Sequence, residues 1–120
     1  GGTMKRILVV DDEENIRMLY QEELQEEGYE VTAAGNGNEA LDILAKAEPF
    51  DLVTLDIRMP GMDGINTVRA IKEKYKGLAV VLVTAYGEYK QDFSTWASDA
   101  YIVKSADLTE LKATIKRIIG

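Results

Sequence analysis

The sequence predicts a single α/β domain in which helices cover both faces of a parallel β-sheet. Five short apolar segments alternate strictly with five segments of helical periodicity. Most of the apolar segments contain few polar residues, which is typical of strands buried on both faces. The connections are short, and no repeat, linker or low-complexity segment interrupts the alternation. One doubly wound domain therefore accounts for the chain.

The five predicted strands are rich in Val, Ile, Leu and Ala. They are residues 5–10, 29–33, 52–56, 78–83 and 100–103. In the second of them, Glu30 and Thr32 alternate with apolar residues, so we expect one face of that strand to be partly exposed. The fourth is the most apolar.

The predicted helices are indicated by apolar residues that recur at a spacing of three or four. The five sets are Ile16, Leu19, Tyr20 and Leu24; Ala40, Leu41, Leu44 and Ala45; Ile65, Val68 and Ile71; Tyr89, Phe93 and Trp96; and Leu111, Ile115 and Ile118. The set at Tyr89 is the weakest, because Gly, Ser and Thr surround it. Asp107–Glu110 resembles a capping box for the last helix, with Asp in place of Ser or Thr.

The composition of the 120 residues excludes several classes of function. The chain has no Cys and no His, so it offers no disulfide, no thiolate zinc site and no Ser-His-Asp triad. With 14 basic and 21 acidic residues its net charge is −7, which argues against direct binding to nucleic acid. No apolar run is long enough to span a membrane, and no signal peptide precedes the first strand. We expect a cytoplasmic domain at residues 4–120, with Gly1–Thr3 as a cloning remnant.

Polar residues stand at the ends of four predicted strands. Asp11 and Asp12 follow the first strand, Asp56 ends the third, Thr84 ends the fourth and Lys104 follows the fifth. Ligands of open α/β sheets bind outside the carboxyl ends of the strands, so these side chains would converge if their strands are neighbours. Three carboxylates in one crevice repel one another, and Mg²⁺ would relieve that repulsion. Lys104 and Thr84 would supply donors for developing negative charge.

In these motifs the chain resembles the receiver domain of response regulators in two-component signalling, and it is similar to the stand-alone chemotaxis regulator (CheY-like). The motifs are the acidic pair Asp11-Asp12, the segment from Asp56 to Gly64 (Asp-Ile-Arg-Met-Pro-Gly-Met-Asp-Gly), Thr84-Ala85 and Lys104. They occur in the family's order and span nearly the whole chain. The resemblance implies a flavodoxin-like (βα)₅ fold with strand order 2-1-3-4-5.

The resemblance also implies a phosphoacceptor signalling domain rather than an enzyme. Asp56 would accept a phosphoryl group from a sensor histidine kinase or a phosphotransfer protein. Asp12, Asp56 and the backbone carbonyl of Arg58 would bind Mg²⁺ directly, and Asp11 would bind it through a water molecule.

The resemblance assigns a second set of residues to the response. Lys104 and Thr84 would bond the phosphoryl group, and the small Ala85 would leave it room. Tyr101 would turn inward as Thr84 moves, and so change the surface formed by the fourth helix, the last strand and the last helix. That surface would control an output protein or domain.

One position departs from the family, which usually has Pro after the lysine, joined by a cis peptide. Here Ser105 follows Lys104. A cis bond before a residue other than proline costs about 2.5–4 kcal/mol. The sequence therefore predicts either a trans bond with a rebuilt loop, which would put the reach of Lys104 in doubt, or a strained cis bond.

Simpler explanations exist for each residue. Asp11, Asp12 and Asp56 could cap helices or turns, Thr84 and Lys104 could be ordinary polar residues at strand ends, and Tyr101 could be a half-buried aromatic of an edge strand.

Rival functions remain too. The domain could be a degenerate receiver that binds partners without phosphorylation. A carboxylate-nucleophile phosphatase is disfavoured, because its second Asp would stand where Arg58 does. The sequence leaves open the kinase, the output, the phosphate lifetime, a phosphorylation-dependent homodimer and whether the domain belongs to a longer protein.

Overall fold

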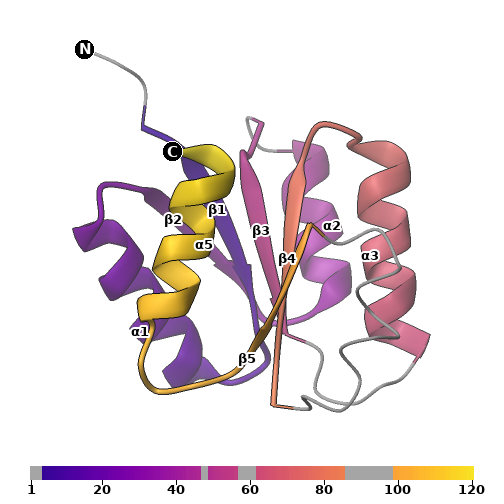
Figure 1. Ribbon diagram of the computed structural model, residues 1–120. Helices are drawn as coiled ribbons and strands as arrows, with labels where there is room; N and C mark the ends of the chain where they lie inside the picture. Colours follow the sequence, from indigo (N-terminus) through magenta and orange to yellow (C-terminus); the bar gives the residue numbers. More distant parts are fainter. Residues whose placement is uncertain (1–3, 47–48, 57–61, 86–98) are drawn as a thin grey trace.

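The computed structural model describes residues 4–46, 49–56, 62–85 and 99–120, and of residues 62–65 the backbone only (Figure 1). The predicted helix around Tyr89, Phe93 and Trp96 lies outside these residues. The strands are β1 (Arg6–Val10), β2 (Glu30–Ala34), β3 (Leu52–Asp56), β4 (Ala79–Thr84) and β5 (Ala100–Val103). The helices are α1 (Glu14–Glu26), α2 (Gly37–Lys46), α3 (Met62–Lys74) and α5 (Thr109–Ile119).

The strands form one parallel sheet in the order β2-β1-β3-β4-β5. This confirms the predicted fold class and strand order. Val10 pairs with Leu55, Asp56 with Val83, and Thr84 with Val103. The register therefore brings the carboxyl ends of β1, β3, β4 and β5 together at one edge of the sheet, which we call the carboxyl edge.

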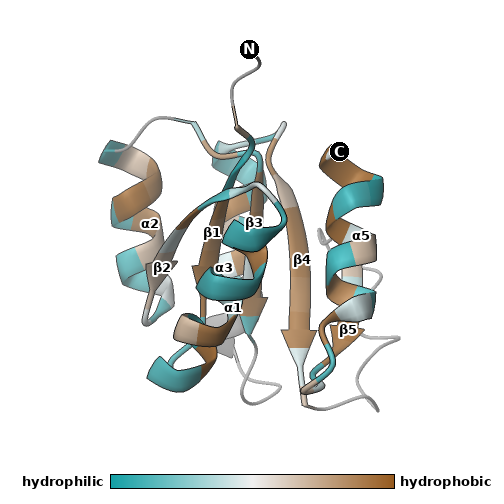
Figure 2. Ribbon diagram, turned by 90° about the vertical axis from the view of Figure 1, so that its left-hand side faces the viewer, coloured by the Kyte–Doolittle hydropathy of each residue, from teal (hydrophilic) through white to brown (hydrophobic). Residues whose placement is uncertain are grey.

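Helices cover both faces of the sheet, α1 and α5 on one face and α2 and α3 on the other (Figures 1 and 2). Each face has its own apolar core because alternate residues of a strand point to opposite sides. The core under α1 and α5 includes Ile7, Val9, Tyr20, Ile102 and Ile115. The core under α2 and α3 includes Leu8, Val10, Val53, Val68 and Ile71. Within the described part of the chain, no helix is long and apolar enough to cross a membrane.

The start of α5 differs from the predicted capping box. The helix begins at Thr109, and its N-cap position is occupied by Leu108. The Asp107 carboxylate instead accepts hydrogen bonds from the Thr109 backbone N–H at 2.9 Å and from its hydroxyl at 2.6 Å. In the predicted capping box, Asp107 would be the N-cap residue itself. In the structure it comes one residue before the N-cap residue, and its carboxylate still bonds the first turn of the helix.

Candidate functional site

Three charged side chains gather at the carboxyl edge on the face that α1 and α5 cover. Lys104 Nζ lies 2.8 Å from Asp11 Oδ2 and 3.3 Å from Asp56 Oδ2. Strand alternation explains this placement, because Asp11 and Lys104 follow Val9 and Ile102 by two residues, and both of these belong to the α1/α5 core. We call these residues the charged triad. It brings together one cation and two anions from the carboxyl ends of three different strands.

The charged triad is held in place mainly through Asp11. The Asp11 backbone N–H donates to the Ala34 carbonyl at 3.1 Å, continuing the pairing of β1 with β2. Its carboxylate accepts a hydrogen bond from the Glu13 N–H at 2.9 Å through Oδ1. The other oxygen, Oδ2, faces Lys104. Asp11 is 2% exposed, so this carboxylate has exchanged most of its hydration for fixed partners.

Burial and neighbouring charges shift the pKa values of Asp56 and Lys104. Burial raises the pKa of Asp56 to about 6, and the neighbouring negative charge of Asp11 adds to the effect, while Lys104 opposes it. Burial by itself would lower the pKa of Lys104, but its hydrogen bonds and attraction to the two carboxylates raise the pKa above the ordinary value. The ion pair thus keeps Lys104 protonated and only partly offsets the cost of ionising Asp56.

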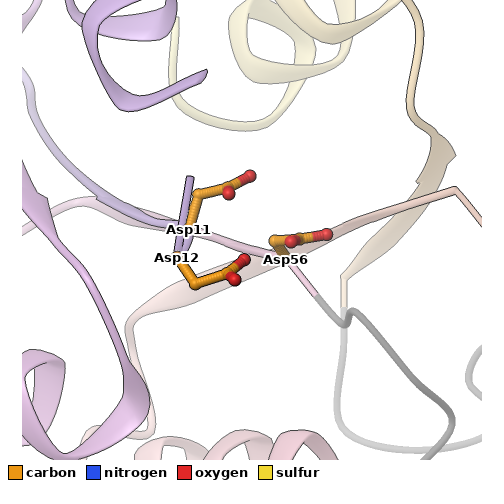
Figure 3. Close-up of side chains that lie close together, drawn as sticks. All are labelled: Asp11, Asp12 and Asp56. Atoms are coloured by element: carbon orange, nitrogen blue, oxygen red, sulfur yellow. The ribbon is translucent and has the colours of Figure 1, made fainter. Parts of the chain in front are cut away.

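Asp12 completes an acidic cluster beside the triad. One carboxylate oxygen each of Asp11, Asp12 and Asp56 lie within 4.8 Å of one another (Figure 3). Asp12 is exposed, whereas Asp11 is buried and Asp56 is partly buried. Two ligands on opposite sides of Mg²⁺ are about 4.2 Å apart, so the cluster is compact enough to hold this ion with small side-chain rotations. Besides Asp12 and Asp56, the backbone carbonyl of Arg58 is the other group expected to bind Mg²⁺ directly, and it lies outside the described residues.

The peptide bond between Lys104 and Ser105 is trans. The Lys104 N–H donates to the Thr84 carbonyl at 2.6 Å, which extends the β4–β5 pairing by one residue. Because the chain leaves the sheet only after this bond, the Lys104 side chain still reaches Asp11 and Asp56. A trans bond after Lys104 is therefore compatible with its contacts to both carboxylates. The Ser105 hydroxyl accepts a hydrogen bond from the Asp107 N–H at 3.1 Å within the loop that follows.

The remaining predicted residues lie on β4, on β5 and just beyond β4. Thr84 is completely buried, and Ala85 next to it is exposed. Tyr101 is partly buried and packs against the α2/α3 core. By strand alternation Thr84 points to the same face as Val80 and Leu82, which belong to that core. Thr84 and Tyr101 therefore lie on the face opposite to the charged triad.

The model of the response regulator receiver domain matches residues 7–116. The chain belongs to this family. Sporulation initiation phosphotransferase F of Bacillus subtilis (strain 168) is 38% identical over 117 residues, which cover 96% of this receiver and 94% of that protein. Transcriptional regulatory protein ResD of Bacillus subtilis (strain 168) is 40% identical, and the match covers 95% of this receiver but 48% of ResD. The receiver thus spans about half the length of that relative.

Solved structures give the same family and fold. The response regulator TrrA of Thermotoga maritima, in complex with Mg²⁺-BeF, has a TM-score of 0.88 and 52% identity, covering 97% of this receiver and all of that chain. A structure of histidine kinase ThkA in complex with TrrA gives a TM-score of 0.86 and 51% identity, covering 98% of this receiver. This receiver is therefore a signalling domain of two-component systems with a CheY-like fold.

Sequence reasoning missed two residues near the site. Tyr20, predicted only as part of a helix face, is 3% exposed in the α1/α5 core. Burial raises its pKa to about 12, and the charges of Lys104, Asp11 and Asp56 also act on its phenol. Arg17 reaches from α1 to the backbone of Asp11. The apolar spacing of Tyr20 could indicate its burial, but no sequence signal places either residue beside the acidic cluster.

Proposed function

We propose that Asp56 is the phosphoacceptor and that the phosphoryl donor is a phosphohistidine of a sensor histidine kinase or a phosphotransfer protein. The observation that carries this proposal is the geometry of the charged triad, which holds Asp56 against Lys104 at the carboxyl edge. The presence of a histidine kinase beside TrrA supports the choice of donor. Because this sequence contains no His, the phosphohistidine would lie outside these 120 residues.

In the transfer, a carboxylate oxygen of Asp56 forms a bond to phosphorus as the P–N bond to the donor imidazole breaks. The imidazole leaves with the electron pair and takes up a proton from solvent. An ionised carboxylate needs no base to activate it, which suits a site without His. Lys104 is placed to stabilise negative charge on the transferring oxygens, and such electrostatic positioning supplies most of the catalysis in phosphoryl transfer.

Mg²⁺ is the expected cofactor, and the compact acidic cluster fits it. Asp12, Asp56 and the carbonyl of Arg58 would hold the ion, with Asp11 acting through a water molecule. When bound, it supplies positive charge that neutralises the phosphoryl oxygens. The complex of TrrA with Mg²⁺-BeF supports this assignment. Ionisation of Asp56 would become easier in the presence of a divalent cation, because the cation favours the charged carboxylate, which burial and the charge of Asp11 disfavour.

The response would arise on the opposite face of the sheet. Thr84 would bond the phosphoryl group, which the small Ala85 leaves room to enter, and Tyr101 would move inward as Thr84 shifts. The phosphoryl group would thus favour one of two arrangements of the surface around β5 and α5, and that surface would bind or release an output partner. We place this switch in the cytoplasm, and we propose that the domain turns over no substrate other than its own phosphoryl group.

The experiment measures intact mass after incubation with acetyl phosphate and Mg²⁺. We expect the parent to gain one phosphoryl group, Asp56→Asn to gain none, and Asp42→Asn, a matched change on α2, to behave like the parent. An unmodified parent that also fails to bind Mg²⁺ with beryllofluoride would overturn the proposal. The alternative, a receiver that binds partners without phosphorylation, would then take its place.

A further inference from the structure

Arg17 makes a contact with the acidic cluster that its sequence position does not reveal. It lies in the first half of α1 and is partly buried. Its Nη1 donates a hydrogen bond of 2.7 Å to the backbone carbonyl of Asp11. A guanidinium donor makes this bond charge-assisted and therefore stronger than one between neutral groups. The side chain thus ties α1 to Asp11, the first residue after β1 and the first of the acidic pair.

The carbonyl that Arg17 holds belongs to the peptide unit joining Asp11 to Asp12. The other contacts of Asp11 fix its own N–H and its carboxylate, through Ala34, Glu13 and Lys104. The bond from Arg17 fixes the remaining polar atom of that residue. Because a peptide unit is planar, holding the Asp11 carbonyl also sets the direction of the Asp12 N–Cα bond. Arg17 therefore limits where the carboxylate of Asp12 can lie relative to Asp56.

The β2–α2 loop passes close to the guanidinium from another side. A Cβ atom built on Gly35 would lie 3.4 Å from Arg17 Nη1 and 3.6 Å from Glu39 Oε2. Glu39 Oε2 accepts a hydrogen bond from the Gly35 N–H at 3.3 Å. The guanidinium consequently has the end of β1 on one side and the start of α2 on another. This confinement favours the rotamer that reaches Asp11.

We propose that Arg17 is a positioning residue that sets the affinity of the acidic cluster for Mg²⁺. This inference rests on the proposed function of the cluster. The expected mechanism is indirect. Arg17 bonds the Asp11 carbonyl, and the fixed peptide unit would hold Asp12 where it can share the ion with Asp56. Partners that orient metal ligands typically change metal affinity by about 10–100-fold when they are removed.

The test is calorimetric titration of Mg²⁺ into the parent, Arg17→Gln, Arg17→Lys and Arg117→Gln. Arg117 lies in the last turn of α5. The C-terminal end of this helix is at the end of the molecule opposite to the carboxyl edge (Figure 1). Substitution of Arg117 matches the change in net charge without touching Asp11. We expect Arg17→Gln to weaken Mg²⁺ binding about tenfold and Arg117→Gln to leave it nearly unchanged. Arg17→Lys, which keeps one donor and the charge, should recover part of the loss.

A second readout separates positioning from general damage. With acetyl phosphate at saturating Mg²⁺, the labelling rate of Arg17→Gln should approach that of the parent, while the Mg²⁺ concentration for half-maximal rate rises. Equal Mg²⁺ affinities for Arg17→Gln and Arg117→Gln would overturn the inference, as would a labelling rate that excess Mg²⁺ does not restore. Failure of the parent itself to bind Mg²⁺ would instead overturn the proposed function. If Arg17→Gln does not fold, the Mg²⁺ affinity of Arg17→Lys is compared with that of the parent, and equal affinities would likewise overturn the inference.

Discussion

The two faces of the sheet use the carboxyl edge in different ways. On the face under α1 and α5, the sheet presents the charged triad, whose members are held by short ion pairs. On the face under α2 and α3, it presents the hydroxyl of Thr84 and the ring of Tyr101 among apolar side chains. One pleated sheet separates the two sets by strand alternation alone. Among the described residues, the charged triad lies on the first face, and Thr84 and Tyr101, neutral groups that can repack, lie on the second.

This difference indicates that the two faces of the sheet have different roles in the proposed function. Buried charges are costly to move apart, so the triad should stay nearly fixed and serve the transfer step. A hydroxyl and a partly buried aromatic ring can change rotamer at lower cost, so they suit the response. The comparison predicts that substitutions on the first face change stability and transfer. Substitutions on the second face should change the response, or only local packing.

The largest expected effect on stability comes from Lys104→Met. This change leaves the carboxylates of Asp11 and Asp56 buried without their cation, and should lower the free energy of unfolding by about 2–3 kcal/mol at pH 7. Chemical denaturation in metal-free buffer would measure it. The double substitution Lys104→Met with Asp56→Asn should recover much of the loss, because only one carboxylate, that of Asp11, is then left without its cation. Equal losses in the single and double variants would contradict the triad.

Asp56→Asn should act in the opposite direction. Because folding raises the pKa of Asp56 from 3.8 to about 6, ionising it destabilises the folded state. The asparagine variant should be more stable than the parent by about 1–3 kcal/mol above pH 6. This advantage should shrink as pH falls from 6 and vanish below about pH 4, where both states of the parent are protonated. Thermal unfolding of both proteins across this range, with EDTA present, checks the sign and the pH window.

A smaller effect is expected from Gly37→Ala at the contact between α2 and α3. A Cβ atom at this position would lie 2.5 Å from Thr67 Oγ1 and 3.3 Å from its methyl carbon, so one side chain must shift. We expect a loss of about 1–2 kcal/mol, measured by denaturation. Gly77→Ala is the matched control, because nothing lies within 4 Å of a Cβ there. Combining Gly37→Ala with Thr67→Ala should cost less than the sum of the two single changes.

The smallest effect on phosphoryl transfer is expected from Thr84→Val. Labelling by acetyl phosphate should change little, because Thr84 is not part of the charged triad that holds Asp56 for the transfer. The amide NMR shifts of β5 on adding Mg²⁺ and beryllofluoride should, however, lose their response. Thr54→Val, a buried threonine of β3 on the other face, should keep that response. If both variants respond alike, the division between the faces is wrong.

Much of this arrangement could be predicted from the sequence, because it follows from where apolar runs stop. Asp56 and Thr84 each end a run that the sheet buries, and Asp11 and Lys104 each directly follow one, so the register alone brings them together. The sequence could not reveal the bond from Arg17 to the Asp11 carbonyl, which depends on the path of the chain between β1 and α1. It also could not fix the start of α5, where Asp107 bonds Thr109 from outside the predicted box. Such contacts depend on the geometry of loops, which the periodic spacing of apolar residues does not predict.

The most direct test of the account is to locate the phosphoryl group. The protein would be incubated with acetyl phosphate and Mg²⁺, reduced with borohydride, which converts an aspartyl phosphate to homoserine, and mapped by tandem mass spectrometry. We expect homoserine at position 56 and at no other Asp position, with Asp11 and Asp12 unmodified. Homoserine at another position, or none in a protein that has gained the mass of one phosphoryl group, would contradict this expectation.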